Sequence, residues 1–521
     1  MKKAPLTLLL ILSILTTLGS KIELSGVVSG NYNYDTLLIT NDLYIETGTA
    51  LHISAGTKVL FDGFYFIDVQ GRIVSAGTLQ QPILFTVMDT LGFADTLAMH
   101  GAWHGIRFIN TPMNNAASEF VYTHFSFTKA LDNDSILQFG GTIHADGFGK
   151  VYFSDCSFAH NHAYRRGGAV AMLNGSNLVF NRCVFEQNAV MFKDDGFGGA
   201  IFGEYSSPTF KYCSFINNDA VWTGGAMCFY YSDPLIQNCI ISGNNGDIGG
   251  GMSFYKCLTN NTISNNLIVN NFALYFGGGI SCNRSSNPVF VNNTIVANQS
   301  TYGGGFYCND SAAPRVYNSI IWDNINFSGL GPVYIWDPLS HPDFFYCDIQ
   351  GGKEQFAGSG GGLGYIGHYE NNMDTLPHFE TGYNLAYSSP LVNAGTPDTT
   401  GLKLPELDLN GLPRISNGRI DLGAYEVMLE GSNGQQPPQL ASLVLAPNPV
   451  QDLLHIEILG TEAKKALLEI VSMEGVKVHN QYINIPDTGF FDINVSTLGK
   501  GKYILSISND KYVAVGKFIK Q

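Results

Sequence analysis

The chain has 521 residues, of which 59 are glycine, 14% are charged and 12% are aromatic. This composition is typical of turn-rich β structure, and it argues against a helical bundle and against a disordered chain. The net charge of −15 argues against nucleic acid as a partner, because a protein that binds phosphates needs a basic surface. The length allows two or three domains.

The first residues have the pattern of an export signal. Lys2 and Lys3 precede a mostly apolar run from Leu8 to Leu15, and small residues follow up to Ser20. The run is too short to span a bilayer. We therefore predict that residues 1–20 are a signal peptide and that the rest of the chain is exported.

A unit of about 27 residues repeats through the middle of the chain. The pairs of glycines that mark it begin at Gly140, Gly167, Gly198, Gly224, Gly249, Gly277 and Gly303. A column of small residues follows at Cys156, Cys183, Cys213, Cys239, Asn266, Asn293, Ser319 and Cys347, and a column of asparagines at Asn161, Asn188, Asn218, Asn244, Asn271, Asn298 and Asn324. A repeat of this length without helical periodicity predicts a parallel β-solenoid, whose strands pair with their copies one coil away.

Three short strands separated by corners are expected in each coil. In residues 223–245 the expected strands are GGAMCFY, PLIQ and CIIS, and the corners are Ser-Asp-Pro, Asn238 and the polar tail. Asparagine suits a corner because it tolerates the left-handed conformation that β-branched residues avoid.

Alternation with a period of two assigns the faces of these strands. Val170, Ile201 and Met227 are expected to point inward, and so is the cysteine column of the third strand. We interpret the thiols as small core residues, because asparagine and serine occur in the same column. Disulfide bonds and metal binding are the alternatives.

The repeat resembles those of chlamydial polymorphic outer membrane proteins. The matching residues are Gly-Gly-Ala-aliphatic sequences at 167–170, 198–201 and 224–227 and Phe-x-x-Asn sequences at 158–161, 185–188 and 215–218. More broadly, residues 40–350 resemble right-handed parallel β-helices of the pectate-lyase-like class. The resemblance implies a right-handed parallel β-helix, which we assign to residues 21–382.

Residues 383–429 interrupt the repeat. Their sequences SP…AG, DLNGLPR and DLGAYE are similar to a closing segment that is common in bacterial β-helix proteins. Because an open solenoid end exposes unpaired strand edges, we expect this segment to cap the solenoid. Asp408, Asn410 and Asp421 could contact a cation, which makes Ca²⁺ the one cofactor considered, but their spacing is not that of a calcium loop and no metal site is assigned.

The end of the chain has a different organisation. A polar linker is expected at residues 430–442, and period-two alternation predicts a small β-sandwich at residues 443–521. This last unit resembles the C-terminal sorting domain of the type IX (Por) secretion system, through Pro447, Asn448, Pro449, Gly475, Gly501, Tyr503 and Lys517. The resemblance implies export by the type IX secretion machinery, followed by release or by attachment to surface lipopolysaccharide at the outer membrane.

Three functions are compatible with this all-β chain, a right-handed parallel β-helix followed by a small C-terminal β-sandwich. The first is adhesion, in which the solenoid binds a glycan or a protein of a host or neighbouring cell. The outward positions expected to bind are Phe202, Glu204, Tyr230, Tyr255, Asn283, Tyr307 and Asn309. Aromatic rings beside amides suit flat contact with sugar rings or with protein, although stacked rings also stabilise a solenoid without any ligand.

The second function is that of a polysaccharide lyase or glycoside hydrolase acting on acidic polysaccharide. The candidate acid–base residues lie on two loops one coil apart and are His160, His162, Arg165, Arg166, Asp194 and Asp195. A solvated loop with a salt bridge between coils is the alternative for these residues. Basic residues are sparse along the glycine-containing strands, so we favour binding over catalysis. The third function is a structural coat without a ligand, which the sequence does not separate from adhesion.

Overall fold

The computed structural model describes residues 20–428, apart from residues 194, 259–261, 330 and 416–417, together with most of residues 439–521. In the latter part, residues 441, 460–464, 473–476, 487–488 and 509–511 are not described. The predicted signal peptide, apart from Ser20, and most of the predicted linker lie outside the described residues. The chain divides into two compact units, Met1–Val427 and Met428–Gln521.

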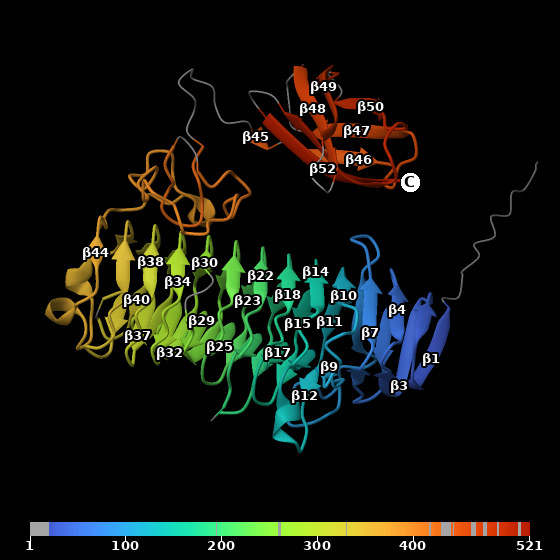
Figure 1. Ribbon diagram of the computed structural model, residues 1–521, viewed down its shortest axis with the longest axis horizontal. Helices are drawn as coiled ribbons and strands as arrows, with labels where there is room; N and C mark the ends of the chain where they lie inside the picture. Colours follow the sequence, from blue (N-terminus) through green and yellow to red (C-terminus); the bar gives the residue numbers. More distant parts are fainter. Residues whose placement is uncertain are drawn as a thin grey trace, which may run out of the picture. The chain divides into compact units, whose positions relative to one another are not determined.

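The first unit is a parallel β-helix with three main walls, whose coils follow one another from β1 to β44 (Figure 1). The glycine wall consists of β6 (Ile67–Val69), β9 (Ile106–Ile109), β13 (Ile143–Asp146), β17 (Val170–Leu173), β21 (Ile201–Glu204), β25 (Met227–Tyr230), β29 (Met252–Tyr255), β33 (Ile280–Asn283), β37 (Phe306–Asn309) and β41 (Val333–Ile335). The second wall consists of β2 (Gly30–Tyr32), β4 (Ala50–Ser54), β7 (Arg72–Ala76), β10 (Ser118–Val121), β14 (Val151–Ser154), β18 (Val179–Asn181), β22 (Thr209–Lys211), β26 (Leu235–Gln237), β30 (Thr262–Ser264), β34 (Val289–Val291), β38 (Arg315–Tyr317), β42 (Asp343–Phe345) and β44 (Tyr369–Glu370). The third wall consists of β5 (Lys58–Phe61), β8 (Ile83–Val87), β11 (Thr123–Ser126), β15 (Ser157–Ala159), β19 (Val184–Glu186), β23 (Ser214–Ile216), β27 (Ile240–Ser242), β31 (Leu267–Val269), β35 (Thr294–Val296), β39 (Ile320–Trp322) and β43 (Asp348–Ile349).

The first coils differ from the others. Strand β3 (Thr36–Ile45) pairs with both β5 and β6, so it belongs to the third wall and to the glycine wall at once. Strand β1 (Lys21–Val27) pairs with residues 36–39 and 43–44 of β3 and forms the first layer of the stack.

The predicted strands of residues 223–245 are confirmed as β25, β26 and β27. Their polar tail, expected to be only a corner, enters a fourth ladder of short parallel strands. This ladder consists of β12 (Lys129–Ala130), β16 (His162–Ala163), β20 (Ala189–Val190), β24 (Asp219–Ala220), β28 (Asn245–Ile248), β32 (Phe272–Phe276), β36 (Gln299–Tyr302) and β40 (Ile325–Asn326). The sequence concealed it because most of these strands have only two to four residues, too few to show an alternating pattern.

Phenylalanines and thiols fill the interior. Phe158 and Phe185 of the third wall stack with ring centroids 4.7 Å apart, and such stacks add about 0.5–1.5 kcal/mol per pair beyond simple burial. All nine cysteines are buried and free. Within the column of small residues, Cys183 Sγ donates to Phe153 O at 3.7 Å and Asn293 Nδ2 donates to Ile263 O at 2.8 Å. A residue in this column must therefore be small and able to donate a hydrogen bond to a carbonyl oxygen of the preceding coil.

The asparagine column forms a buried hydrogen-bonded ladder. From Asn161 to Asn324, each Nδ2 donates to Oδ1 of the next asparagine at 2.9–3.0 Å. The left-handed corner residue precedes each of them, as at Asn217 (φ 53°) before Asn218. Asn238 does occupy a left-handed corner itself, with φ 54°, as the sequence predicted.

The glycine pairs have two distinct roles. The first glycine of each pair is left-handed, with φ between 63° and 71° from Gly140 to Gly303. The second lies against the next coil: a Cβ on Gly199 would be 2.1 Å from the carbonyl oxygen of Gly225. Only glycine permits both the corner and this close approach.

A partial coil ends the stack. Ala357 pairs with Tyr334, β44 pairs with β42, and Met373 pairs with Asp348. The short 3-10 turns η2 (Lys353–Gln355) and η3 (Gly362–Gly364) lie in this region, whereas η1 (Ser135–Gln138) follows β12 and η4 (Thr381–Tyr383) begins the closing segment.

The closing segment lies along the side of the solenoid (Figure 1, orange). Its residues Leu391 and Leu422 pack against outward side chains of the third wall, which include Val296. The corner asparagines hold its backbone: Asn265 Nδ2 donates to Leu407 O at 3.0 Å, and Asn292 Nδ2 donates to Asp421 O at 2.8 Å. The segment thus covers the outward side of the third wall in the last coils. It was expected to cap the end of the solenoid, but the partial coil covers that end instead.

The second unit is a β-sandwich, as predicted. One sheet has the order β45 (Gln439–Leu440), β52 (Tyr512–Lys520), β51 (Gly501–Ser508), β48 (Lys465–Ser472) and β49 (Lys477–Asn484), and the other β46 (Ser442–Ala446), β47 (Leu453–Leu459) and β50 (Phe490–Asn494). Leu454, Leu468, Leu505 and Phe518 are buried between them. Among the described residues of both units, no helix has the length and apolarity to cross a membrane.

Candidate ligand-binding face

The outer side of the glycine wall carries two columns of side chains in register, which we call the outer face. The first column consists of Tyr44, Asp68, Arg107, His144, Ala171, Phe202, Cys228, Ser253, Ser281, Tyr307 and Tyr334. The second consists of Ile109, Asp146, Leu173, Glu204, Tyr230, Tyr255, Asn283 and Asn309. Every residue predicted to bind a ligand belongs to one of these columns, because the alternation held through each coil.

A charged cluster centred on Arg166 lies at one edge of the outer face. Arg166 Nη2 lies 2.9 Å from Asp195 Oδ1, and Arg166 Nη1 lies 3.2 Å from Glu204 Oε2. Arg165 Nη1 contacts the same Asp195 at 3.2 Å. The Arg166 guanidinium also lies 5.0 Å from the ring centroid of Phe202. Two guanidinium groups and two carboxylates therefore satisfy one another within the cluster.

The predicted histidines lie apart from this cluster. His160 is at a corner and stacks on Phe127, with ring centroids 5.5 Å apart. His162 is in β16 and packs on Phe93 at 4.6 Å, and burial lowers its pKa to about 4. The described residues show no contact of either ring with Arg166, and Asp194 lies outside them. Of the six predicted acid–base residues, the structure brings together Arg165, Arg166 and Asp195.

Two stacked tyrosines form the centre of the outer face. The rings of Tyr230 and Tyr255 are nearly parallel, with centroids 4.5 Å apart and 5° between their planes. Both side chains are partly exposed, as are Glu204 and Asn309. Phe202, Asn283 and Tyr307 also point outward, but they are at most 5% exposed. These three were expected to be accessible. Phe197, just before Gly198, packs against Phe202, and Phe276, just before Gly277, packs against Tyr307.

A second aromatic cluster extends the face toward the C-terminal coils. The Phe276 ring lies 4.7 Å from that of Tyr307 and 5.5 Å from that of Trp336, and Tyr302 lies 5.1 Å from Tyr334. Trp336 is 47% exposed. The sequence did not mark Tyr334 and Trp336, because Gly-Pro replaces the glycine pair before β41; the register with Tyr307 would have found Tyr334.

From β25 to β37, the two columns of the outer face contain only uncharged side chains. Burial raises the pKa of the Tyr255 phenol to about 12 and raises the pKa values of Tyr230 and Tyr307 as well. The phenols therefore stay protonated and can both donate and accept hydrogen bonds. Ser253 and Ser281 lie beside them, with their hydroxyl oxygens 2.7 Å apart.

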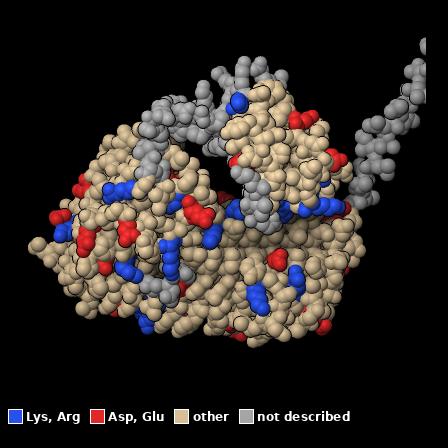
Figure 2. Space-filling view, turned by 45° about the horizontal axis from the view of Figure 1, so that its top comes forward, with Lys and Arg blue, Asp and Glu red and all other residues tan. Residues whose placement is uncertain are grey.

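Charged side chains are few on the visible surface. Figure 2 shows blue and red residues interspersed among uncharged ones on the face that it presents. This view contains no broad field of one sign that would attract a polyanion.

The residues considered for a cation have other partners. Asp408 accepts hydrogen bonds from the main-chain nitrogens of Leu412 and Glu426, each at 2.7 Å. Asp421 likewise accepts from two main-chain nitrogens, and Asn410 Nδ2 donates to Asn384 Oδ1 at 2.6 Å. In the described part of the chain, no three His, Cys, Asp or Glu side chains gather as metal ligands would.

The predicted sorting residues meet at the last strand of the second unit. Asn448 Nδ2 donates to Lys517 O, and Asn448 Oδ1 accepts from Ile519 N, both at 2.9 Å. Pro447 and Pro449 line a hollow that also includes the C-terminal Gln521. Gly501 begins β51, in which the Tyr503 hydroxyl donates to Gly499 O at 2.9 Å. Gly475 lies outside the described residues.

Comparisons with known families agree with both units. Residues 123–278 match the model of a right-handed β-helix region, and residues 444–521 match that of a secretion system C-terminal sorting domain. No curated protein matches the chain. The first unit is thus a right-handed parallel β-helix. The sorting domain shows that the type IX secretion system exports the protein, which is displayed on the cell surface or released.

Proposed function

We propose that this protein is an extracellular binding protein whose outer face holds an uncharged glycan. The parallel stack of Tyr230 and Tyr255, partly exposed and followed in the same column by the amides of Asn283 and Asn309, carries the proposal. Sugar rings present flat C–H faces and hydroxyl groups, which fit aromatic rings next to neutral hydrogen-bonding groups. Adhesion of the cell that displays the protein, or capture of the glycan by released protein, is the role that this binding would serve.

The shape of the face suits an extended chain. The two aromatic clusters lie on successive coils, from Tyr230 on β25 to Trp336 after β41. Coils repeat about every 4.8 Å, so a ligand that follows the solenoid axis meets one set of side chains after another. An oligosaccharide of several residues is long enough to contact both clusters.

The charges favour a neutral ligand over an acidic one. Arg165 and Arg166 are paired with carboxylates. Further along, Lys256 Nζ contacts the Tyr231 hydroxyl at 2.9 Å and Arg284 approaches Asp310 at 4.0 Å. To bind an acidic polysaccharide, Arg165 and Arg166 would have to exchange their carboxylate partners for the ligand.

The same geometry favours binding over catalysis. Asp195 and Glu204 both accept hydrogen bonds from the Arg166 guanidinium, so neither is free to transfer a proton. His160 and His162, the other candidates for a base, pack on aromatic rings elsewhere. An arrangement for acid–base chemistry needs a proton donor and acceptor free to reach one substrate bond.

The test is a glycan array probed with the full chain and with a variant carrying Tyr230→Ala and Tyr255→Ala. We expect binding to neutral oligosaccharides that the double variant weakens by about tenfold or more. Tyr317→Ala is the matched control, because Tyr317 stacks on Phe345 at 4.9 Å on the second wall. Unchanged binding by the double variant would refute the proposal.

A parallel absorbance assay for unsaturated uronides tests the enzymatic alternative. We expect no absorbance increase with acidic polysaccharides. An increase that disappears in Arg166→Ala would identify a lyase and would contradict the proposal.

A further inference from the structure

A pocket that shares no residue with the outer face lies among the first coils. Its volume is about 650 Å³, within the range of roughly 300–1,000 Å³ typical of small-molecule sites. One side is formed by Phe61, the last residue of β5, and by residues 62–64, which follow it. The other side is formed by both ends of the loop between β8 and β9.

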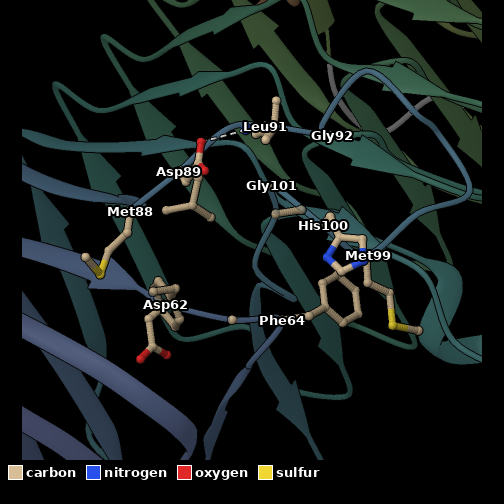
Figure 3. Close-up of a pocket in the computed structure, with 13 residues that line it drawn as sticks. Asp62, Phe64, Met88, Asp89, Leu91, Gly92, Met99, His100 and Gly101 are labelled. Atoms are coloured by element: carbon tan, nitrogen blue, oxygen red, sulfur yellow. Dashed lines mark hydrogen bonds between the residues drawn. The ribbon is translucent and has the colours of Figure 1, made fainter.

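The interior of the pocket is apolar and its rim is mixed. Phe61, Val87 and Ala102 are buried and form the floor. In Figure 3, Met88 lies on one side of the pocket, and Phe64 and His100 lie on the opposite side.

The loop that forms most of the pocket is anchored from below. Lys129 is 1% exposed, and its Nζ donates to Asp95 O at 2.8 Å and to Ala98 O at 2.9 Å. Phe93 of the loop packs on Phe127 and His162, with ring centroids 5.1 and 4.6 Å apart. A loop held in this way keeps its shape before a ligand arrives, which lowers the entropic cost of binding.

This anchored loop holds large apolar side chains in solvent. Of the residues that line the pocket, Met88 is 59% exposed, Leu91 80% and Met99 51%. Several such residues around one hollow mark a binding site more often than chance exposure, and methionine adapts readily to apolar ligands.

The charges at the rim are all negative. Asp62 and Asp89 lie at opposite edges of the pocket (Figure 3), and both are exposed. Neither forms an ion pair with another described residue, and no lysine or arginine lines the pocket. One Asp89 oxygen accepts from Leu91 N at 2.8 Å, which fixes that carboxylate at the rim.

We propose that this pocket binds a small amphiphilic cation, with an apolar body against Phe61, Val87 and Met88 and an ammonium or guanidinium group at the rim, which Asp62 and Asp89 make negative. The apolar floor supplies most of the affinity, and the carboxylates select the charge. The site is independent of the glycan-binding proposal, because the two share no residue.

The test compares two ligands with the same apolar body, 2-(2-naphthyl)ethylamine and 2-(2-naphthyl)ethanol, titrated into the full chain by calorimetry. We expect the amine to bind about 1.5- to 5-fold more tightly than the alcohol, since an exposed charge pair contributes about 0.2–1 kcal/mol. Equal affinities, or no binding of the amine at millimolar concentration, would overturn the proposal.

Variants locate the site. Asp62→Asn with Asp89→Asn should remove the preference for the amine and leave alcohol binding unchanged, and asparagine keeps the acceptor for Leu91 N. Met88→Ser with Leu91→Ser should weaken both ligands. The controls are Glu119→Gln and Met113→Ser, exposed residues outside the pocket, and an equal effect of either control would contradict the assignment.

Discussion

At the scale of single residues, the solenoid depends on side chains that satisfy several main-chain and side-chain groups at once. Asn218 donates to Phe185 O and to Asn244 Oδ1, and its own Oδ1 accepts from the main-chain and side-chain nitrogens of Asn188. All of these groups are buried. Removing one such side chain abolishes all four of these buried hydrogen bonds at once, which is costly in an environment without water.

We predict that Asn218→Ala lowers the free energy of unfolding by about 3 kcal/mol, since several buried polar groups lose their partners. Urea unfolding of the full chain, followed by tryptophan fluorescence, measures this, because Trp103, Trp222, Trp322 and Trp336 all lie in the solenoid. The control Asn114→Ala, at an exposed loop position, should change it by less than about 0.5 kcal/mol. Equal effects of the two substitutions would refute the role of the ladder.

A second prediction concerns pH and Glu426 in the closing segment. Its buried carboxylate lies 2.9 Å from Arg414, and burial outweighs this cation and raises the pKa from 4.5 to about 8. Between these values the folded state binds more protons than the unfolded state, so stability falls as pH rises through the window and levels off above about 8.

The variant Glu426→Gln isolates this contribution. The difference in unfolding free energy between the wild type and the variant should decrease from about pH 5 to about pH 8.5. Urea titrations at several pH values give this difference. A difference that stays constant or increases with pH would contradict the assigned direction of the shift.

The candidate residues also show what a sequence can and cannot predict at this scale. Arg166 and Asp195 meet because they occupy similar positions in successive coils, and positions of this kind are visible in a repeat. The burial of Phe202 and Tyr307 was not visible, because it depends on the loops that precede the glycine pairs. The histidines lie apart from the arginines: His160 occupies a left-handed corner and His162 lies in β16, before the loop that carries Arg165 and Arg166.

At the scale of elements, the glycine pairs determine how closely the coils can approach. The first glycine supplies a left-handed corner, and the second removes the side chain that would strike the next coil. These requirements differ, so they predict different costs for substitution at each type of position.

We predict that Gly199→Ala destabilises the solenoid by about 3 kcal/mol or more, because the new Cβ would meet the Gly225 carbonyl oxygen at 2.1 Å and the main chain has to move. Gly147→Ala is the control, since Gly147 is left-handed (φ 74°) but has open space around its Cβ position. It should cost only about 1–2 kcal/mol. If Gly147→Ala proved as costly as Gly199→Ala, strain in φ and not contact between coils would explain the glycine wall.

The walls were predictable because a strand and its copy one coil later are related by a simple repeat. The fourth ladder was missed because most of its strands are too short to show an alternating pattern. The position of the closing segment was also missed. Asn238 reaches Leu407 O, 169 residues later in the chain, and no local pattern encodes a contact of that range.

At the scale of the whole molecule, the two units have separate tasks. The β-helix carries the outer face and the pocket among the first coils, and the sorting domain directs export through the type IX system. We predict that deleting residues 428–521 in the native bacterium leaves the protein in the periplasm. Cell fractionation and immunoblotting measure this, with the Tyr230→Ala, Tyr255→Ala variant as a control that should be exported normally. Truncated protein at the cell surface or in the medium would refute the prediction.

The central claim is that the outer face binds a glycan through its aromatic rings. The most direct test is a calorimetric titration with the oligosaccharide that binds best on the glycan array. It is titrated into the wild type, Tyr255→Ala and Tyr317→Ala. We predict that Tyr255→Ala raises the Kd by about tenfold or more while Tyr317→Ala leaves it unchanged. A Kd that responds equally to both substitutions, or to neither, would contradict the assignment of this face.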